Sequence, residues 1–384
     1  MTRPSSEILE YLAGQREPMI TLLAELVNID SGSYNKAGVD AVGARLRAHL
    51  EAHDVACETI PNAAYGDCLR ARVGGDGGQQ NILIMGHRDT VFPDGTAAAR
   101  PFHVEGTRAT GPGVADMKSG LVMNSFVLEA FQRFGGAPSP LVGLYTSDEE
   151  IASPSSRPII EAEARQARAV FNSEPGRPTG NVVSQRKGAA FLKLSITGKA
   201  VHSGVDHKAG ISAIEALARK VQRLHALTDY DSGISINVGL VRGGTAVNTV
   251  AAHATAEIDV RFTSLETMDD VLARVRAICA AEEIPGSTSR ITHEGKFLPL
   301  VPTPASMRLI DLYTRCAREL GFTVKGEATG GSADSGFCAV LGAATVCATG
   351  PVGGNAHRDD EWCAIDTLIP RAQVLALTIL RLAG

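Results

Sequence analysis

The sequence predicts an α/β protein in which a smaller domain is inserted into a larger one. Short, nearly continuous apolar stretches at Asn81–Met85, Leu141–Thr146 and Ala169–Phe171 are typical of strands buried in an α/β sheet. The middle of the chain follows a different order of strand, helix, strand, strand, helix and strand. With 384 residues, the chain is also too long for one ordinary core, so two domains are expected.

The larger domain alternates these strands with segments of helical periodicity. Apolar residues at helical spacing predict helices over Ile8–Asn28, Ala37–His53, Ser119–Phe134 and Ser306–Leu320, and from Asp366 onward. The helix over Ser119–Phe134 would be the crossover that follows the first buried strand, and "ATVCATG" would be a late strand. The Gly-rich stretch Gly74–Gln80 is predicted to be a flexible turn.

The middle of the chain defines the inserted domain. "AAFLKLSITGKA", "GISINVGLVRGG", "HATAEIDVRF" and "SRITHEG" are predicted strands, whereas "AGISAIEALARKVQRLHAL" and Leu265–Ala281 are predicted helices. This order is the split βαβ arrangement. We therefore expect an inserted domain over residues 187–296, which divides a larger domain into residues 1–186 and 297–384.

Composition excludes several classes of function. The net charge of −5 provides no basic surplus for nucleic acid or an anionic membrane. No apolar run reaches the roughly 18 residues of a membrane span. The N-terminal stretch lacks the apolar core of a signal peptide, and the 7 scattered cysteines form no CxxC pair. These features indicate a protein of the reducing cytoplasm.

Acidic and imidazole side chains gather where strands are predicted to end. They are His87 in "MGHRDTVFP", Asp116 in "GPGVADMKSG", Glu149 and Glu150 after "LVGLYTSD", Glu174 after "ARAVFNS", and His357 in "GNAHRDDEW". Open α/β sheets bind ligands at the carboxyl ends of their strands. Two histidines with several carboxylates at that edge suit a pair of zinc-like ions, with one carboxylate shared between them.

Each of these residues, taken singly, could have a purely structural role. Asp116 could cap the following helix, and the Glu149–Glu150 pair could interact with a helix dipole. "HRD" also occurs in the catalytic loop of protein kinases, but no DFG and no upstream phosphate loop accompany it. The structural roles would all have to hold at once, and therefore we favour the metal centre.

The motifs together resemble the di-zinc metallohydrolase family of glutamate carboxypeptidase, acetylornithine deacetylase and succinyl-diaminopimelate desuccinylase. They run in family order over nearly the whole chain: "GHRDTVFP", "GPGVADMKSG", "TSDEE", "NSEP", "GKAVHSG", "GGTAVNTV", "TGGSADSG" and "HRDDEW". "SQRKGAAFLKLSITGKAVHSG" and "TGGSADSGF" are most similar to the glutamate carboxypeptidase branch. The resemblance implies a zinc-exopeptidase-like mixed sheet flanked by helices, with an inserted ferredoxin-like βαββαβ domain for dimerisation and for covering the site.

The resemblance also implies a ligand set for two zinc ions per chain, or for other divalent metals. Asp116 would bridge both ions, His87 and Glu174 would complete one site, and Glu150 and His357 would complete the other. A cis peptide bond would follow Asp116.

Two neighbours of these ligands have implied roles. Asp89 would accept the second ring N–H of His87 and so fix its tautomer. Glu149 would be the general base that takes a proton from water and returns it to the departing amine, since an amide nitrogen leaves poorly when unprotonated.

A homodimer is implied as well, formed through the exposed edge strand of the inserted domain. His202 of "TGKAVHSG" would reach the partner's active site and donate a hydrogen bond to the scissile carbonyl. The nearby His207 is the rival for this role.

The implied substrate is a small N-acyl amino acid or peptide with a free carboxylate, whose cleavage releases glutamate or a similar amino acid. Candidate carboxylate-binding residues are Asn248, Arg261, Lys296, Gly330 and Gly331. Lys296 stands where the glutamate carboxypeptidase branch carries arginine, and an ammonium does not grip a carboxylate as a guanidinium does. Aspartate or another amino acid could therefore take the place of glutamate as the released product.

Three alternatives remain at this point. An acetylornithine-type deacetylase would remove a small acyl group from a basic amino acid, and a di- or tripeptidase would cleave short peptides. A metal-stabilised dimeric binding protein without catalysis would lack Glu149 or a ligand, and the sequence has them all.

Overall fold

The chain forms two compact units in a computed structural model that describes residues 3–75 and 80–382. The first unit comprises Met1–Gln185, Pro302–Thr329 and Phe337–Gly384, and the second comprises Arg186–Val301 and Gly330–Gly336. The second unit thus contains the segment 187–296 and adds Arg186, residues 297–301 and Gly330–Gly336, which sequence analysis assigned to the larger domain. The predicted turn at Gly74–Gln80 lies largely outside the described residues.

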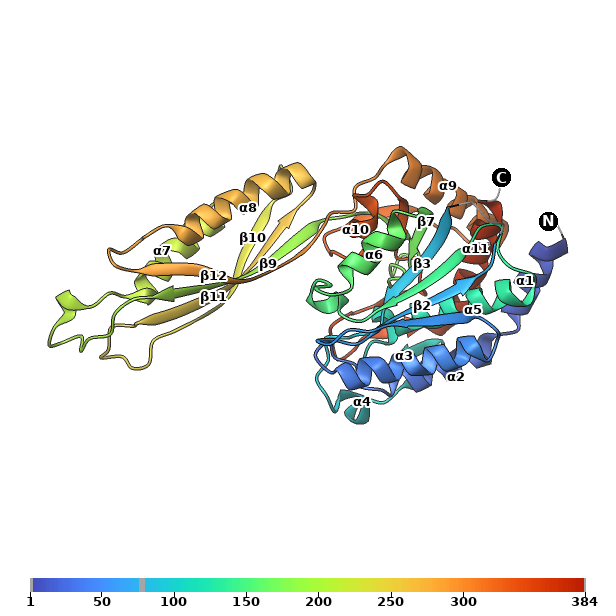
Figure 1. Ribbon diagram of the computed structural model, residues 1–384, viewed down its shortest axis with the longest axis horizontal. Coiled ribbons are helices and arrows are strands. Elements are labelled where there is room, and N and C mark those ends of the chain that lie inside the picture. Colours follow the sequence, from blue (N-terminus) through green and yellow to red (C-terminus); the bar gives the residue numbers. More distant parts are fainter. Residues whose placement is uncertain (1–2, 76–79, 383–384) are drawn as a thin grey trace. The chain divides into compact units, whose positions relative to one another are not determined.

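The first unit is built on a mixed sheet of 8 strands in the order β1-β2-β6-β3-β7-β14-β8-β13 (Figure 1). Its central strands β6, β3, β7 and β14 are parallel neighbours. The strands are β1 Ala56–Ile60, β2 Cys68–Val73, β3 Asn81–His87, β6 Leu141–Thr146, β7 Ala167–Asn172, β8 Val182–Arg186, β13 Gly326–Thr329 and β14 Ala344–Cys347. The predicted buried strands are therefore confirmed, and β3 continues two residues further, to His87.

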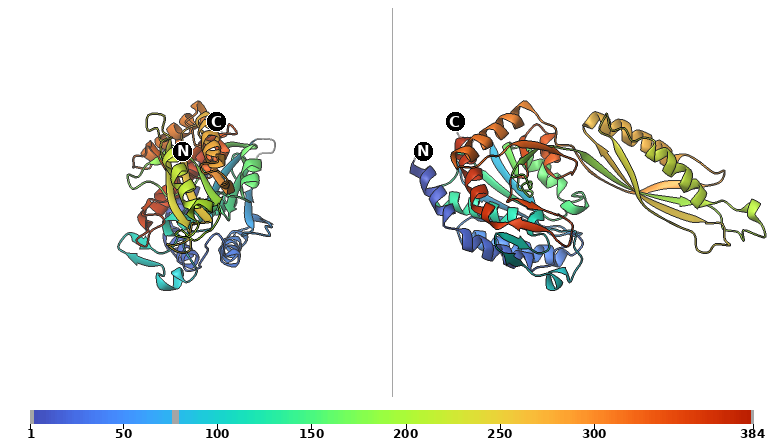
Figure 2. Two further views of the ribbon diagram at one scale, coloured as in Figure 1. Left: turned by 90° about the vertical axis from the view of Figure 1, so that its left-hand side faces the viewer. Right: turned by 180° about the vertical axis from the view of Figure 1, so that it is seen from behind.

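Helices α3, α5, α6 and α9 pack on this sheet. The helices of the first unit are α1 Arg3–Ala13, α2 Arg16–Val27, α3 Lys36–Glu51, α4 Thr96–Ala99, α5 Ser119–Arg133, α6 Arg157–Ala164, α9 Pro304–Glu319, α10 Ser335–Ala339 and α11 Leu368–Arg381. Every residue of α5 from Ser119 to Phe131 is buried, because α5 packs between the sheet and α1, α2, α3 and α11. The first and last helices, α1 and α11, pack against each other (Figure 2).

The single helix predicted over Ile8–Asn28 is wrong, since two helices occupy this stretch. Gly14 and Gln15 separate them, and their amides bond to Tyr11 and Leu12, three residues back instead of four. Glycine costs a helix roughly 1 kcal/mol relative to alanine, which favours a break at this position. The apolar spacing continues across the break because α1 and α2 both pack their apolar faces against α5 and α11.

A small sheet joins two distant parts of the first unit. It contains β4 His103–Glu105, β5 Arg108–Thr110, β15 Gly353–Gly354 and β16 Trp362–Ala364, in the order β15-β16-β5-β4. Trp362 pairs with Thr110, so the segment that carries His357 is tied to the strand just before the loop of Asp116.

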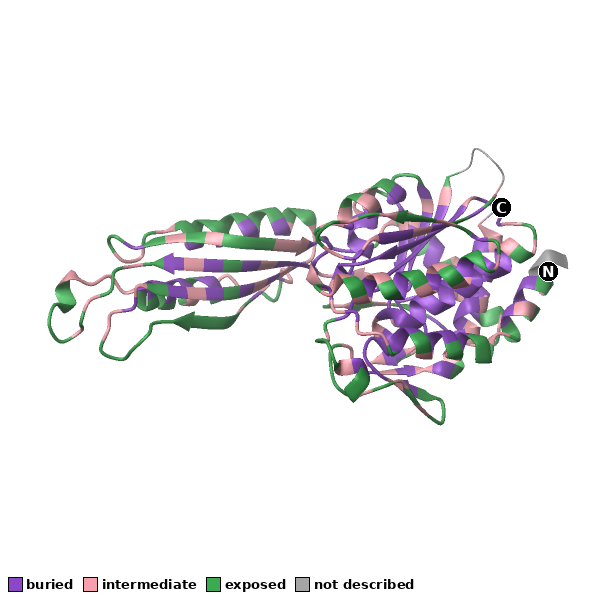
Figure 3. Cartoon of the chain, turned by 60° about the horizontal axis from the view of Figure 1, so that its bottom comes forward, coloured by how far each residue is buried: buried purple, intermediate pink, exposed green. Residues whose placement is uncertain are grey.

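The second unit has the predicted βαββαβ order. Its elements are β9 Gly188–Thr197, α7 Ala213–His225, β10 Ser235–Gly243, β11 His253–Phe262, α8 Leu265–Ala280 and β12 Thr288–Phe297. The strands form an antiparallel sheet in the order β10-β11-β9-β12. Buried residues alternate with more exposed ones along β9 and β11, since α7 and α8 pack on this sheet (Figure 3). The edge strand β10 exposes Leu240 and Val241.

Among residues 3–75 and 80–382, no helix combines the length and the apolar character that crossing a bilayer requires.

The C-terminus of α8 depends on a buried lysine of α7. The side chain of Lys220 is 1% exposed, and its Nζ donates to the carbonyls of Ile278 at 2.8 Å and Cys279 at 3.0 Å, and also to that of Ala281. An ammonium therefore adds a charged donor to the carbonyls at the end of α8, where helical partners run out. Two of these carbonyls also accept weaker, uncharged donors, the amide of Ala281 and the hydroxyl of Ser289.

We predict that Lys220→Met lowers the free energy of unfolding by about 1.5–3 kcal/mol, because buried carbonyls lose a charged donor. Chemical denaturation of Lys220→Met should be compared with that of Lys193→Met, whose side chain is 52% exposed. Equal stabilities of the two variants would contradict the capping role.

Candidate active site

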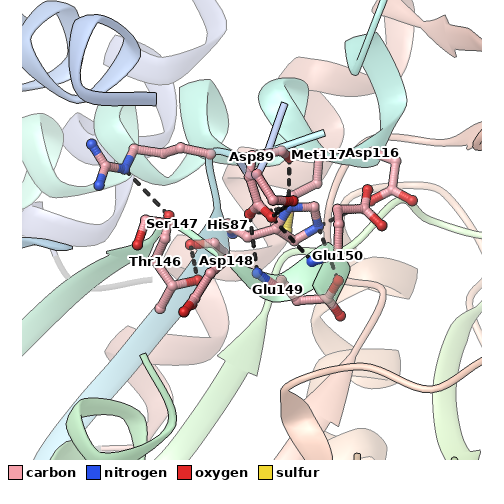
Figure 4. Close-up of polar contacts among 12 residues, drawn as sticks. His87, Asp89, Asp116, Met117, Thr146, Ser147, Asp148, Glu149 and Glu150 are labelled. Carbon is pink, nitrogen blue, oxygen red and sulfur yellow. Dashed lines mark hydrogen bonds and ion pairs between the residues drawn. The ribbon is translucent and has the colours of Figure 1, made fainter. Parts of the chain in front are cut away.

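The site lies at the carboxyl ends of three adjacent parallel strands. His87 at the end of β3 is level with Thr146 at the end of β6, and Met85 is level with Asn172 at the end of β7. The short turn after β6 then carries Glu149 and Glu150, and Glu174 follows β7 by two residues. This register brings a carboxylate oxygen of Glu174 to 3.7 Å from His87 Nε2. It also brings one of Glu149 to 3.9 Å, and Figure 4 shows Glu149 beside His87.

His87 is buried and its tautomer is fixed by the backbone. Its Nδ1 lies 2.9 Å from the carbonyl oxygen of Asp89, which can only accept, so Nδ1 carries the proton. The other nitrogen, Nε2, then presents a lone pair or a second proton towards Asp116 Oδ1 at 3.1 Å. A neutral ring oriented in this way is the form in which histidine binds a metal.

The carboxylate of Asp89 has a different main partner from the one we expected. It lies 3.4 Å from His87 Nδ1, further than the carbonyl of the same residue. It accepts hydrogen bonds from the amides of Glu149 and Glu150, both at 3.1 Å, and from the Ser33 hydroxyl at 2.7 Å. Asp89 therefore orients the turn that carries both glutamates as well as the imidazole.

Asp116 stands between the two histidines. Its Oδ1 lies 3.1 Å from His87 Nε2, and its Oδ2 lies 3.4 Å from His357 Nε2. The predicted cis peptide bond between Asp116 and Met117 is confirmed. Burial alone would raise the pKa of Asp116, but hydrogen bonds from the two imidazoles hold it below the usual range.

Glu150 and His357 form the second half of the site. His357 Nε2 lies 3.1 Å from Glu150 Oε2, and hydrogen bonding to Asp116 and Glu150 raises the pKa of His357 to about 11. Burial, with the nearby Asp116 charge, raises the pKa of Glu150 to about 7. The other oxygen of Glu150, Oε1, is buried and has no hydrogen-bond partner.

The donor set fits divalent cations. Five carboxylates converge on two imidazoles, and the partnerless Glu150 oxygen is a buried acceptor that needs a cation or a donor. Ligand atoms of His87, Asp116 and Glu150 lie within 4.8 Å of one another, as do those of His87, Glu149 and Glu174. The second group places Glu149 beside predicted ligands, so its distinct role stays a prediction.

Sequence analysis missed Glu361. This residue is 0% exposed, and its carboxylate accepts the amides of Gly113 at 2.9 Å and of Ala115 and Asp116 at 2.8 Å each. Since Glu361 follows His357 by four residues, it links the loops of two predicted ligands. Its place in "HRDDEW" was the available signal, but partners 245–248 residues away do not follow from a motif.

The predicted carboxylate-binding residues belong to the second unit, and the structure does not bring all of them together. Arg261 pairs with Ala189, and Lys296 pairs with Ala190. Because successive residues of β9 point to opposite faces, Arg261 and Lys296 also lie on opposite faces of this sheet. Two side chains on opposite faces of a sheet cannot bind the same carboxylate. In addition, the Nε of Arg261 donates a hydrogen bond to Asp259 Oδ1 at 2.8 Å.

The remaining predicted binding residues lie in loops of the second unit. Ser332, next to the exposed Gly330 and Gly331, accepts a hydrogen bond from Arg261 at 3.0 Å. Asn248 is exposed, and its carbonyl accepts the amide of Ser203 at 2.9 Å.

The hydrogen bond between Ser203 and Asn248 places Asn248 beside His202. His202 is exposed and forms an isolated antiparallel β-bridge with Thr249. The Nδ1 of His202 accepts the amide of Gly204 at 3.2 Å, so the neutral ring carries its proton on Nε2. His202 therefore presents a donor, as its predicted role requires.

We predict that Glu361→Gln weakens zinc binding by about 10–100-fold, the usual effect of removing a group that orients ligands. The three backbone amides bond to both carboxylate oxygens of Glu361, whereas the side chain of glutamine has only one acceptor oxygen. Affinity should be measured by competition with a chelator, and Asp359→Asn, 93% exposed, is the matched control. Unchanged zinc affinity in a folded Glu361→Gln chain would show that this link is unimportant.

Comparisons with known proteins agree on one family. The profile of "Peptidase family M20/M25/M40" matches residues 83–381. Carboxypeptidase G2 of Pseudomonas sp. is 28% identical over 386 residues, covering 99% of this chain and 93% of that protein. Succinyl-diaminopimelate desuccinylase of Rhodospirillum centenum is 28% identical over 355 residues, covering 85% and 88%.

Solved structures show the same fold. The M20 family metallo-carboxypeptidase Sso-CP2 from Sulfolobus solfataricus matches with a TM-score of 0.78 at 18% identity, covering 95% of this chain and 99% of that one. A tripeptidase from Staphylococcus aureus matches with a TM-score of 0.73 at 20% identity, covering 96% and 98%. Since the family profile covers well over half of the sequence, this chain belongs to peptidase family M20/M25/M40, a metal-dependent family of peptidases and amidohydrolases.

Proposed function

We propose that this protein is a zinc-dependent hydrolase that cleaves the amide bond of N-acyl or peptidyl amino acids with a free carboxylate. The observation that carries the proposal is the Asp116 carboxylate, with one oxygen towards each of two histidines. Released glutamate, or an amino acid like it, is the product we favour, because "SQRKGAAFLKLSITGKAVHSG" and "TGGSADSGF" resemble the glutamate carboxypeptidase branch.

In this proposal, five side chains would hold two divalent ions. His87 and Glu174 would bind one ion, Glu150 and His357 would bind the other, and Asp116 would be shared. Such ions would polarise the scissile carbonyl as Lewis acids and would lower the pKa of bound water to near neutral.

Glu149 is the proposed general base. Its side chain is 9% exposed, and its Oε2 lies 3.9 Å from His87 Nε2, beside the ligands. Asp89 holds the amide of Glu149, which fixes the turn from which the carboxylate extends. A carboxylate oriented in this way can accept a proton from water and return it to the departing amine nitrogen.

His202 is the proposed second donor to the scissile carbonyl, acting from the partner chain of a homodimer. Its Nε2–H, set by the bond from Gly204 to Nδ1, is the group that would stabilise the developing oxyanion. The exposed edge strand β10 is the proposed pairing surface.

Substrate binding rests on the second unit. We keep Arg261 and the neighbouring Gly330–Gly331 segment as candidates on one face of the sheet, together with Asn248 in its loop. Lys296, on the opposite face, is a weaker candidate.

The substrate class is tested with zinc-loaded enzyme and a panel of N-acyl-glutamate, N-acyl-aspartate, N-acetyl-ornithine, N-succinyl-diaminopimelate and di- and tripeptides. We expect the highest kcat/KM for an N-acyl or peptidyl acidic amino acid, and reversible loss of activity on chelation. Preference for acetyl-ornithine, succinyl-diaminopimelate or a peptide with a free amine would replace the proposed substrate. Full activity in metal-free protein would contradict the mechanism.

Glu149→Gln should lower kcat by about 10²–10⁴-fold while metal content and substrate affinity are retained, because a proton acceptor is lost and no ligand is. The matched variant is Glu150→Gln, its neighbour in the sequence, which should lose metal. Loss of metal only from Glu149→Gln would show that Glu149 is the metal ligand and Glu150 is the general base.

His202→Ala should lower kcat by about 10²–10³-fold without loss of zinc, since one oxyanion donor is removed. His207→Ala is the control and should be mild. Mixing His202→Ala with Glu149→Ala chains should restore activity, because each mixed dimer then contains one complete site. A mixture with demonstrated subunit exchange that stays inactive would exclude action of His202 across the interface.

A further inference from the structure

A second group of metal-ligand side chains lies at the C-terminal end of α3. His49 is in the last turn of α3, His53 follows just after that helix, and Glu129 projects from α5. None of these residues belongs to the catalytic set described above. Tyr11 of α1 donates a hydrogen bond to the same glutamate.

The three side chains meet with the spacing of ligands around one ion. Glu129 Oε2 lies 3.0 Å from His49 Nε2, and Glu129 Oε1 lies 3.2 Å from His53 Nε2. Two ligand atoms about 2.0–2.1 Å from a tetrahedral zinc lie about 3.3 Å from each other. One ligand atom of each residue lies within 4.8 Å of the others. The two imidazoles reach Glu129 together because they are four residues apart on a helical turn.

Hydrogen bonding sets the imidazole of His53 in a metal-binding orientation. Its Nδ1 lies 2.8 Å from the carbonyl oxygen of His49, so Nδ1 carries the proton. In the neutral ring, Nε2 therefore directs a lone pair at a carboxylate oxygen, and these two atoms repel unless a positive charge lies between them. His87 in the candidate active site has the same arrangement, with a carbonyl at Nδ1 and a carboxylate at Nε2.

The contact between His49 and Glu129 does not have the geometry of a hydrogen bond, and it is an ion pair only when the ring is protonated. His49 Nε2 and Glu129 Oε2 are both buried, and neither has a hydrogen-bond partner although they lie 3.0 Å apart. The side chain of Glu129 is 2% exposed, so an uncompensated charge there is costly. The negative end of the α3 dipole at this point favours a cation further.

We propose that His49, His53 and Glu129 bind one divalent cation of the zinc class, at a site separate from the catalytic centre. The His53 side chain is 37% exposed, which gives an ion access and leaves its fourth position to water. The ring of His49 packs on Phe126 with centroids 4.7 Å apart, which fixes its orientation. The ion would connect α3 to α5, and through Tyr11 to α1, so its role is to stabilise the N-terminal helices.

The test measures zinc bound per chain after equilibrium dialysis of metal-free, full-length protein against buffered Zn²⁺. His49→Gln/His53→Gln should bind one equivalent less than the wild type, whatever number the catalytic centre holds. The matched control is His103→Gln/His225→Gln, which changes two exposed histidines and should bind as many ions as the wild type. Equal binding by the first double variant and the wild type would overturn the site.

A second experiment uses a variant without the two active-site histidines, so that zinc at the proposed site is measured separately from zinc at the catalytic centre. The chain with His87→Ala/His357→Ala should retain an equivalent of Zn²⁺ that is lost when His49→Gln/His53→Gln is added, and Glu129→Gln should have the same effect. The retained ion should raise the Tm of that background, because it binds the folded chain only. If His87→Ala/His357→Ala retains no zinc, the three side chains form a polar cluster without a metal and the proposal fails. This readout does not involve hydrolysis, and its Glu129→Gln arm decides the question if chains with His49→Gln/His53→Gln do not fold.

Discussion

The carboxylate of Asp116, shared between the imidazoles of His87 and His357, is the interaction on which the rest of the site depends. A buried carboxylate is costly unless charge or hydrogen bonds compensate it. Here each oxygen faces a different imidazole, which divides the surrounding acids into two halves. Glu174 lies on the His87 side and Glu150 lies on the His357 side. The proposed chemistry of this chain follows from that division.

The scaffold supplies this geometry from segments that are far apart in the sequence. Parallel pairing of β3 with β6 and β7 fixes the heights of His87 and of both glutamate-bearing turns. Asp89 then ties one of those turns to β3 through two backbone amides. On the other side, β5 pairs with β16, and Glu361 accepts hydrogen bonds from the Asp116 loop, so two sets of contacts link the loop of His357 to that of Asp116.

Much of this could be predicted because the relevant information is local. A buried strand ends where its apolar run ends, and parallel strands present their carboxyl ends at one edge, so His87 and Glu174 could be placed together from the sequence. The βαββαβ order of the second unit followed from periodicity in the same way. The break between α1 and α2 was missed because apolar spacing continues across Gly14.

Other features depend on register, which a single sequence does not contain. Arg261 and Lys296 were grouped by chemistry, but pairing with successive residues of β9 sets them on opposite faces. A bulge in β12 between Ile291 and His293 changes that register by one residue, and no motif marks it. The partners of Glu361 lie hundreds of residues away and could be recognised only after the chain had folded.

The central claim is that Asp116 is shared between two metal ions, and anomalous diffraction at the zinc absorption edge tests it most directly. Crystals of the zinc-loaded chain should show two peaks beside Asp116, one next to each carboxylate oxygen and each within about 2.0–2.2 Å of it. Glu174 and Glu150 should lie against different peaks. A single peak, or peaks that leave Asp116 without a metal contact, would contradict the account.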